Sequence, residues 1–299
     1  MTTNRLTTYI REKNLDTKNI IYWIFRIAVA AEFIGHGAFG IITKESWIPY
    51  FNLFGVDRET GFQIMPLVGS IDISLGILAL FVPIRAMLLW MTFWGLFTAT
   101  IRPLSGENWF ELPERTYNFL IAFSFLYLSG FPTKIKDWFT PLWPSKIPSF
   151  TRPKAHTLGI ILRITIAGMM IGHGGYGAIV QKEVYINHWA SIGITSNVVD
   201  PMTFIIAVGI MEIAIGIAVF IKPFYSLLGF IFAWKLLTEF LFPMSGTPIF
   251  EWIERGGSYA APLALIFIMS FYPPSGVAIW NLFERKSHSK SSIEEKTNS

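Results

Sequence analysis

Two histidines inside apolar stretches are the residues of this sequence best suited to proton chemistry. His36 follows Glu32 by four positions, so a helix would place both side chains on one face. A histidine beside a carboxylate can move protons or contact a quinone carbonyl, because the pKa of imidazole is close to physiological pH. His173 lies in a similar stretch, but Met169 stands where the first stretch has Glu32. We therefore expect two related sites that differ in chemistry.

Two further roles for these histidines stay open. If they face each other at one depth of a membrane, they could ligate a haem, although we favour a quinone over haem and expect no metal site. The chain has no cysteine, which excludes disulfides and thiolate metal sites. Alternatively, the glycines around them serve close packing, since Ala31-x-x-x-Gly35 and Gly168-x-x-x-Gly172 are small-x-x-x-small patterns.

Charged residues within the apolar stretches form a second group of candidates, because each costs roughly 2.5–3.5 kcal/mol to insert into a membrane. Arg26 and Asp72 lie at similar depths in successive, oppositely directed helices, and so do Arg163 and Glu212. We expect each pair to form an intramembrane salt bridge. Such a bridge either clamps two helices, since loss of one partner strands a buried charge, or relays protons or substrate.

A further intramembrane pair occurs in the second half of the chain only. Lys235 and Glu239 are spaced as i, i+4 partners, whereas the corresponding first-half residues are Gly95 and Ala99. This difference favours one asymmetric site, and a pair that only joins helices is the alternative.

A loop motif, Pro-x-Ser-Gly followed by Phe-Glu-x-x-Glu-Arg, also occurs twice. It places Glu111 with Arg115, and Glu251 with Arg255, at i, i+4 spacing on a short helix that we expect at the surface. An exposed pair contributes under about 1 kcal/mol. Because the pairs are duplicated and close in depth to the histidines, a lid or a contact to a quinone headgroup is the alternative.

The composition is that of a membrane protein. Of 299 residues, 52% are hydrophobic and only 15% are charged, whereas soluble domains have about 25% charged residues. The net charge of +4 is sorted by loop rather than gathered on one face, so nucleic acid is not an expected partner. A bilayer core is crossed by roughly 20 apolar residues. The stretches that fit are about 20–43, 62–82, 84–101, 116–131, 157–180, 202–221, 224–242 and 256–272, and they predict an all-α integral membrane protein with eight transmembrane helices.

The basic residues indicate the orientation. They gather in the N-terminal tail (1–19), a linker (132–156) and the C-terminal tail (273–299). An even number of spans places all three segments on one side, which the positive-inside rule makes cytoplasmic. We therefore expect a multi-pass protein of the cell (inner) membrane, in contact with the lipid bilayer and with both termini in the cytoplasm.

The chain contains one unit written twice. The matching segments are Arg26–Gly40 with Arg163–Gly177, Gly69–Asp72 with Gly209–Glu212, Trp94 with Trp234, and Pro103–Arg115 with Pro243–Arg255. We call 20–131 the first unit and 157–272 the second unit. Since each unit has four spans, both enter the membrane from the same side, as parallel repeats.

The repeated unit resembles the DoxX/DoxD-like membrane proteins. The resemblance rests on an Arg early in the first helix, Gly-His-Gly late in it and a Lys near its outer end. Here these are Arg26, Gly35-His36-Gly37 and Lys44, and in the second unit Arg163 and Gly172-His173-Gly174, with Gln181 in place of the Lys and Lys182 one position later. The resemblance implies a respiratory or redox association, as in the quinone-linked thiosulfate oxidoreductase that gives the family its name. A fused tandem departs from the family pattern, and no catalytic role is carried over.

Three functions follow as hypotheses, and whether the chain is an enzyme stays open. The first is a quinone-binding or respiratory redox accessory subunit. Its pocket would lie in the outer half of the membrane, lined by His36, His173, Glu32, Glu111, Arg115, Glu251 and Arg255. The second is a transporter or channel for a small solute or for protons, suggested by the acids near mid-membrane. The third is a non-catalytic assembly partner, suggested by the glycine-rich helix faces.

Overall fold

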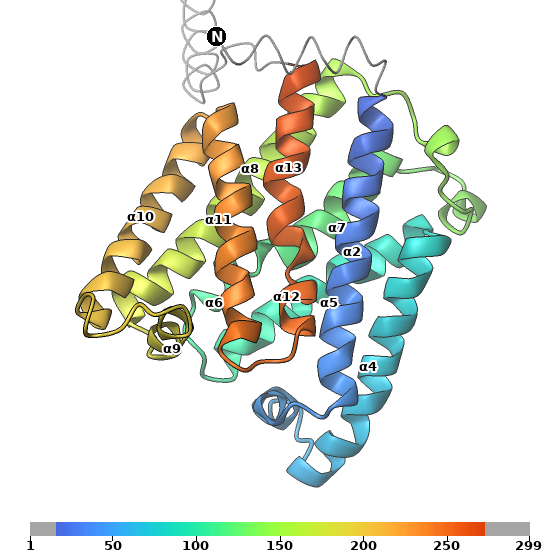
Figure 1. Cartoon of the computed structure of the whole chain (residues 1–299). Helices are drawn as coiled ribbons and strands as arrows, with labels where there is room; N and C mark the ends of the chain where they lie inside the picture. Colours follow the sequence, from blue (N-terminus) through green and yellow to red (C-terminus); the bar gives the residue numbers. More distant parts are fainter. Residues whose placement is uncertain (1–15, 273–299) are drawn as a thin grey trace, which may run out of the picture.

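The computed structural model of the protein describes residues 16–272, which form a bundle of α-helices with no strand among them (Figure 1). The expected tails therefore lie largely outside the described residues, although Thr17 already begins the first helix. One long helix lies over each predicted apolar stretch: α2 (Thr17–Ile41), α4 (Arg58–Phe81), α5 (Arg85–Leu104), α7 (Thr116–Ser129), α8 (Arg152–Gly175), α10 (Pro201–Ile221), α11 (Tyr225–Met244) and α13 (Gly256–Phe271). The all-α prediction is confirmed.

Not all of these helices are suited to crossing a membrane by themselves. Within 16–272, five are both long and apolar enough: α2, α4, α10, α11, and α8 together with its π-helical continuation η4 (Tyr176–Val180). Helices α7 and α13 have 14 and 16 residues, which is short of the roughly 20 that a span needs. The described residues thus make a helical protein with five candidate membrane spans.

An aspartate caps the N-terminus of the second long helix in each unit. Asp57 precedes α4 and accepts a hydrogen bond from the backbone N–H of Thr60 at 3.0 Å. Asp200 precedes α10 and accepts one from the N–H of Thr203 at 2.8 Å. Each carboxylate satisfies a backbone donor that has no partner inside the helix. This capping marks where the second long helix of each unit begins.

The first helix of each unit packs against a helix of the other unit as well as against its own. In the first unit α2 packs along α4 and also along α13 of the second unit, while in the second unit α8 packs along α10 and also along α7 of the first. The core between them is apolar and includes Phe25, Tyr117, Phe125, Leu162 and Leu265. Helices α4, α5, α10 and α11 lie outside this centre.

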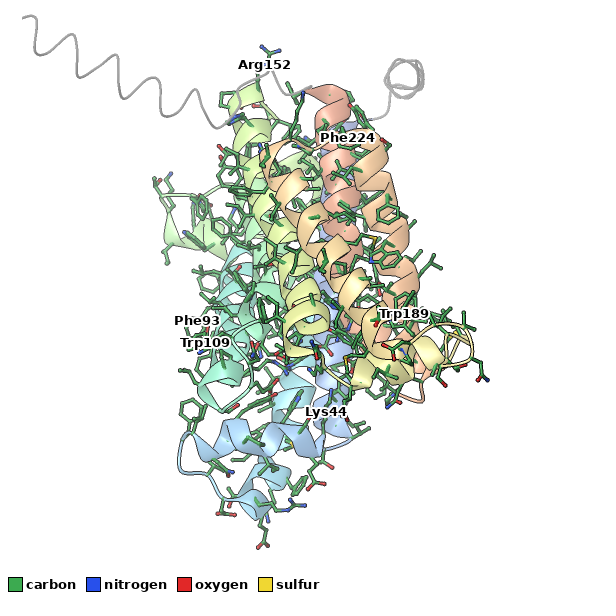
Figure 2. The ribbon with its side chains drawn as sticks, turned by 90° about the vertical axis from the view of Figure 1, so that its left-hand side faces the viewer. Lys44, Phe93, Trp109, Arg152, Trp189 and Phe224 are labelled. Atoms are coloured by element: carbon green, nitrogen blue, oxygen red, sulfur yellow. The ribbon has the colours of Figure 1, made fainter. Side chains whose placement is uncertain are left out.

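The two ends of the bundle carry different short helices. Short helices gather toward one of them: α3 (Ile48–Asn52), α6 (Glu111–Glu114), α9 (Val184–Ala190) and α12 (Phe250–Glu254). Figure 2 shows Lys44 and Trp189 toward this short-helix end, and Arg152 and Phe224 at the opposite end. We call the opposite end the linker end, because the 132–156 segment lies there with two short 3-10 helices, η2 (Ile135–Trp138) and η3 (Pro144–Lys146).

Glycines allow α6 and α12 to enter the bundle. A Cβ added to Gly35 of α2 would lie 2.6 Å from the Cα of Glu254, and one added to Gly172 of α8 would overlap the backbone of Glu114. Each short helix therefore rests against the first helix of the other unit. The small-x-x-x-small patterns therefore mark the helix faces on which one unit contacts the other. Gly168, for example, faces Thr116 of the first unit.

Candidate functional site

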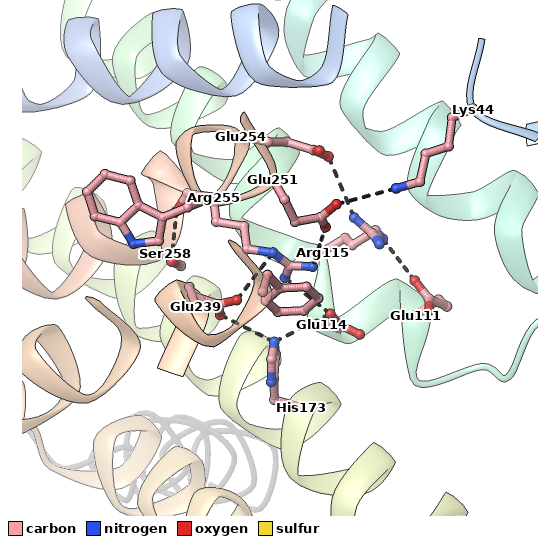
Figure 3. Close-up of polar contacts among 12 residues, drawn as sticks. Lys44, Glu111, Glu114, Arg115, His173, Glu239, Glu251, Glu254, Arg255 and Ser258 are labelled. Atoms are coloured by element: carbon pink, nitrogen blue, oxygen red, sulfur yellow. Dashed lines mark hydrogen bonds and ion pairs between the residues drawn. The ribbon is translucent and has the colours of Figure 1, made fainter. Parts of the chain in front are cut away.

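The two Glu-x-x-Glu-Arg motifs meet in a buried group of charges, which we call the interunit cluster (Figure 3). Its members are Glu111, Glu114 and Arg115 of the first unit and Glu251, Glu254 and Arg255 of the second. Within each motif the arginine binds the first glutamate: Arg115 Nε lies 2.8 Å from Glu111 Oε2, and Arg255 Nη2 lies 3.0 Å from Glu251 Oε1. The i, i+4 spacing thus gives two intrahelical ion pairs.

The second glutamate of each motif pairs across the unit boundary. Arg115 Nη1 lies 3.9 Å from Glu254 Oε1, and Arg255 Nη1 lies 3.5 Å from Glu114 Oε1. The exchange has the same form in both directions, as expected of two equivalent units. These pairs join the units through charges that are nearly inaccessible to solvent.

Two lysines repeat this exchange nearer the short-helix end. Lys44 Nζ of the first unit lies 3.4 Å from Glu251 Oε2, and Lys182 Nζ of the second lies 3.5 Å from Glu111 Oε1. Lys182 therefore makes the contact in the second unit that Lys44 makes in the first, although it stands one position later in the repeat. Between the lysines opens a cavity of about 700 Å³, the polar cavity, which Arg102, Glu107, Glu114, Arg115 and Arg255 also line.

The prediction that the loop helices lie on the surface is wrong. Glu111 and Arg255 are only 2% and 3% exposed, because α6 and α12 rest against glycines of the opposite unit. Burial alone would raise the pKa of Glu251, but the charges of Arg255 and Lys44 outweigh burial and lower this pKa to about 2. The motif carboxylate is therefore held ionised by its partners.

This lowered pKa gives a prediction for acid stability. Because the folded pKa of Glu251 is about 2 and its ordinary value is 4.5, unfolded chains bind more protons between these values. The contribution of Glu251 is thus fully present above about pH 4.5 and is lost as the pH falls toward 2. We expect thermal-unfolding midpoints to fall with pH across this window, and to fall less steeply in Glu251→Gln. Equal slopes in the two proteins would contradict the prediction.

The predicted salt bridge between Arg26 and Asp72 does not form. Asp72 Oδ2 instead lies 2.8 Å from His36 Nδ1, and His36 stands ten residues beyond Arg26, about 15 Å along the helix at 1.5 Å per residue. Arg26 donates a hydrogen bond to the hydroxyl of Tyr22 at 2.7 Å and lies over the ring of Trp23. It therefore belongs to the linker end.

The predicted salt bridge between Arg163 and Glu212 is wrong for the same reason. The Arg163 guanidinium donates to the carbonyl oxygens of Phe220 and Ile221, so it satisfies acceptors at the end of α10. Glu212 accepts a hydrogen bond from the indole N–H of Trp234 at 2.8 Å. Arg26 and Arg163 thus both lie nearer the linker end than their predicted partners, Asp72 and Glu212.

His36, which binds Asp72, lines a cavity in the first unit that we call the aromatic pocket. Its volume is about 230 Å³, and its other lining residues are Trp47, Tyr50, Phe51, Phe54, Val68, Trp94, Phe97, Thr98, Ile101 and Arg102. The ring of His36 stacks on Trp47 with centroids 4.6 Å apart. Asp72 occupies Nδ1 of this ring, and the opposite ring nitrogen, Nε2, has no hydrogen-bond partner among the described residues.

The corresponding pocket of the second unit has closed. Its cavity is only about 30 Å³ and is lined by His173, Tyr185, His188, Trp189, Val208, Glu212, Thr238, Leu241 and Phe242. His188 stands where the first unit has Tyr50, and Phe242 where it has Arg102. Burial, aided by the charge of Arg255, lowers the pKa of His188 to about 4, so its imidazole is neutral at pH 7.

A second difference between the units is a buried ion pair that only the second unit contains. Lys235 Nζ lies 2.5 Å from Glu239 Oε1, and neither residue has exposed surface. Glu239 also lies 3.3 Å from His173 Nε2 and 3.2 Å from Arg255 Nε. The second unit thus extends the interunit cluster to its histidine, whereas in the first unit Gly95 lets α5 and α7 approach closely.

The candidate residues do not form a single pocket. His36 lies in the aromatic pocket, whereas Glu111, Arg115, Glu251 and Arg255 line the polar cavity. His173 binds Glu114 and Glu239 rather than facing His36. The side chain of Glu32 is buried and lines neither cavity. Among the described residues, no group of three or more His, Asp or Glu side chains is arranged to hold a metal ion.

Several residues of the site were missed by the sequence reasoning. Glu114 and Glu254 stand inside the repeated motif but have no i, i+4 partner, so the helical pairing rule passed over them. Trp47 and Tyr50 come from a loop in which the two units differ. Trp94 was visible only as a repeated residue, and its indole N–H donates to Asp72 at 3.4 Å.

Comparison with known proteins finds no relative: no protein-family model, no curated protein and no solved structure matches this chain.

Proposed function

We propose that this chain is a quinone-binding membrane protein with eight membrane-spanning helices, and that the aromatic pocket of the first unit is its quinone site. The observation that carries the proposal is this cavity of about 230 Å³, lined by aromatic rings and by His36, which binds Asp72. The resemblance of each unit to DoxX/DoxD-like proteins supports a redox association. An accessory subunit of a respiratory or redox complex fits both, with a further redox protein as its partner.

The pocket matches the chemistry of a quinone headgroup. Such a ring is flat and apolar, with an oxygen at each of two opposite edges, and it packs between aromatic side chains. His36 Nε2 is available to bond one oxygen. Arg102, which donates to the hydroxyl of Tyr50 at 2.9 Å, lines the pocket as well and supplies a donor for the other oxygen. The Tyr50 hydroxyl itself donates to Glu107.

The surface of the bundle supports the membrane assignment. Large apolar side chains point outward from α4, α5, α10 and α11, among them Leu67, Phe93, Ile210 and Leu237, each more than half exposed. A soluble protein rarely exposes apolar surface continuously around a bundle. The basic linker end would then face the cytoplasm, and both cavities would open toward the other side.

Filling the pocket tests the proposal. In Val68→Phe the larger ring occupies part of the cavity, and we expect a short-chain ubiquinone analogue to bind about tenfold more weakly or worse, a loss of about 1.4 kcal/mol. Binding to protein in lipid nanodiscs can be followed by quenching of tryptophan fluorescence, since Trp47 and Trp94 line the cavity.

Leu67→Phe is the matched control, because Leu67 is the preceding residue of α4 and is 62% exposed. It should bind the analogue like the unsubstituted protein. The proposal fails if the unsubstituted protein binds neither ubiquinone nor menaquinone analogues, or if both variants bind equally well.

A solute carrier is the second candidate, favoured by the polar cavity of about 700 Å³. It requires a polar route to the linker end as well. The described core on that side is built of apolar side chains such as Ile21, Phe25 and Leu158. Liposome flux that depends on Asp72 and Glu212 would favour this candidate over the quinone site.

A further inference from the structure

We propose that the linker end of the bundle binds anionic phospholipid headgroups, and that the linker itself (132–156) is the element that lies in the bilayer surface. Such a contact is separate from the aromatic pocket and involves no quinone. It would supply negative charge that the chain does not provide at this end.

The cations of the linker end bind neutral oxygen atoms rather than carboxylates. Arg85 donates to the carbonyl oxygen of Ser129 at 2.7 Å, and Lys154 donates to that of Leu128 at 2.6 Å. Arg163 also donates to carbonyl oxygens, those at the end of α10. None of the ion pairs among the described residues includes a cation of this end. A carbonyl satisfies the donors of a cation but not its charge, so the positive charge of this end is left uncompensated there.

The linker end also carries far more basic than acidic side chains. Within the described part of the chain, its acidic residues are Asp16 and Asp137. Its basic residues are Lys18, Arg26, Arg85, Lys134, Lys136, Lys146, Arg152, Lys154, Arg163 and Lys222. The segments outside the described residues, 1–15 and 273–299, are themselves richer in basic than in acidic residues. They therefore do not supply the missing negative charge, and a partner outside the chain is needed for it.

The linker is held beside the turn between α4 and α5. The backbone N–H of Leu142 donates to the carbonyl oxygen of Pro83, which lies in this turn, at 2.8 Å. The hydroxyl of Tyr22 donates to the carbonyl oxygen of Leu142 at 2.7 Å, and the side chains of Leu142 and Ile147 are buried. Because this turn joins two apolar helices, the linker runs at the depth where these helices would leave a bilayer.

Large apolar side chains nevertheless point outward from the linker. Ile135 and Phe139 are 77% and 60% exposed, and Trp143 is 44% exposed. Lys134 and Lys136 flank Ile135 and are exposed as well. Apolar side chains between lysines are typical of a segment in the membrane interface. There the apolar groups enter the acyl boundary, and the ammonium groups reach the phosphates.

The exposed apolar surface of the linker continues onto the bundle. The ring of Phe131 has its centroid 6.3 Å from that of Trp138 in the linker and 6.4 Å from that of Tyr127 in α7. The ring of Tyr127 in turn lies 6.5 Å from that of Phe123, one helical turn earlier. A soluble anion would bind the lysines only and would leave these rings in water. A phospholipid meets both the cations and the rings, so the occupant that fits this surface is an anionic lipid.

The test uses a label on the linker. Because the chain has no cysteine, Ile135→Cys provides a single site for a fluorophore. The labelled chain is reconstituted into phosphatidylcholine vesicles that contain a small fraction of spin-labelled lipid. The spin label is placed at the same acyl position of either phosphatidylglycerol or phosphatidylcholine. We expect phosphatidylglycerol to quench the fluorophore more strongly at equal fractions, because its anionic headgroup accumulates beside the linker.

Neutralising two lysines of the linker should weaken this preference. For Lys134→Gln combined with Lys136→Gln we expect a loss of roughly fivefold in relative affinity for each lysine, because a basic side chain near an anionic bilayer contributes about 1 kcal/mol. Both lysines are exposed, so the thermal-unfolding midpoint should not change. Arg58→Gln is the matched control. Arg58 is exposed at the short-helix end and lies 2.6 Å from Glu45, and its replacement should leave the preference unchanged.

Three results would overturn the proposal. The first is equal quenching by the two lipids, and the second is an unchanged preference in the double lysine variant. The third is displacement of phosphatidylglycerol by inorganic phosphate beyond the effect of sodium chloride at the same ionic strength, since this would indicate a site for a soluble anion. No quinone enters the measurement, so its outcome is independent of whether the aromatic pocket binds one.

Discussion

Replacing Lys235 by methionine is expected to destabilise the protein by about 3–5 kcal/mol, the usual cost of breaking a buried ion pair from one side. The substitution keeps the aliphatic stem of the side chain and removes only the charge. Glu239 then keeps Arg255 at 3.2 Å, but that guanidinium is already shared with Glu114 and Glu251. The free energy is read from thermal unfolding in mild detergent.

The control and the double variant make this prediction specific. Leu237 stands two residues later and is 68% exposed, so Leu237→Met should change the midpoint little. Lys235→Met combined with Glu239→Met removes both charges, and its cost should be clearly less than the sum of the two single costs. Additive costs would show that the two side chains are not coupled.

The second large effect is expected at the glycines that admit the short helices. Gly35→Ala and Gly172→Ala should each destabilise the protein by about 1–3 kcal/mol or more, because the new methyl group meets backbone atoms rather than a flexible side chain. For Gly172 the obstacle is the backbone of Glu114, and for Gly35 that of Glu254. Thermal unfolding again gives the free energy.

Gly229→Ala supplies the matched control for these variants. Gly229 lies in α11, and a Cβ there would meet nothing within 4 Å. Alanine is favoured over glycine in a helix by about 1 kcal/mol, so this variant should be unchanged or more stable. If all three variants behave alike, the close approach of α6 and α12 to α8 and α2 is not what limits stability.

The charged residues in the apolar stretches show the limit of predicting ion-pair partners from the position of each residue along its helix. Depth along the helices paired Asp72 with Arg26, whereas the structure places it against His36, ten residues further along α2. A helix rises only about 1.5 Å per residue, so an error of two or three turns in relative depth exchanges one partner for another. The i, i+4 spacing predicted the Lys235–Glu239 pair correctly, but it did not bring Glu32 within ion-pair distance of His36, which binds Asp72 instead.

The sequence by itself determined the helices, their order and the twofold repetition, because apolar length, helix caps and motif spacing are local properties of the chain. It also determined the short-range pairs within each Glu-x-x-Glu-Arg motif. Only the tertiary structure decided that the arginine of each motif pairs with a glutamate of the other unit. It also decided that the residues expected to line one pocket lie in two separate cavities, the aromatic pocket and the polar cavity. It also decided that only one of the two pockets stays open. The physical reason is that such contacts join residues more than a hundred positions apart, such as Lys44 and Glu251, and depend on which helix faces meet, which no local pattern specifies.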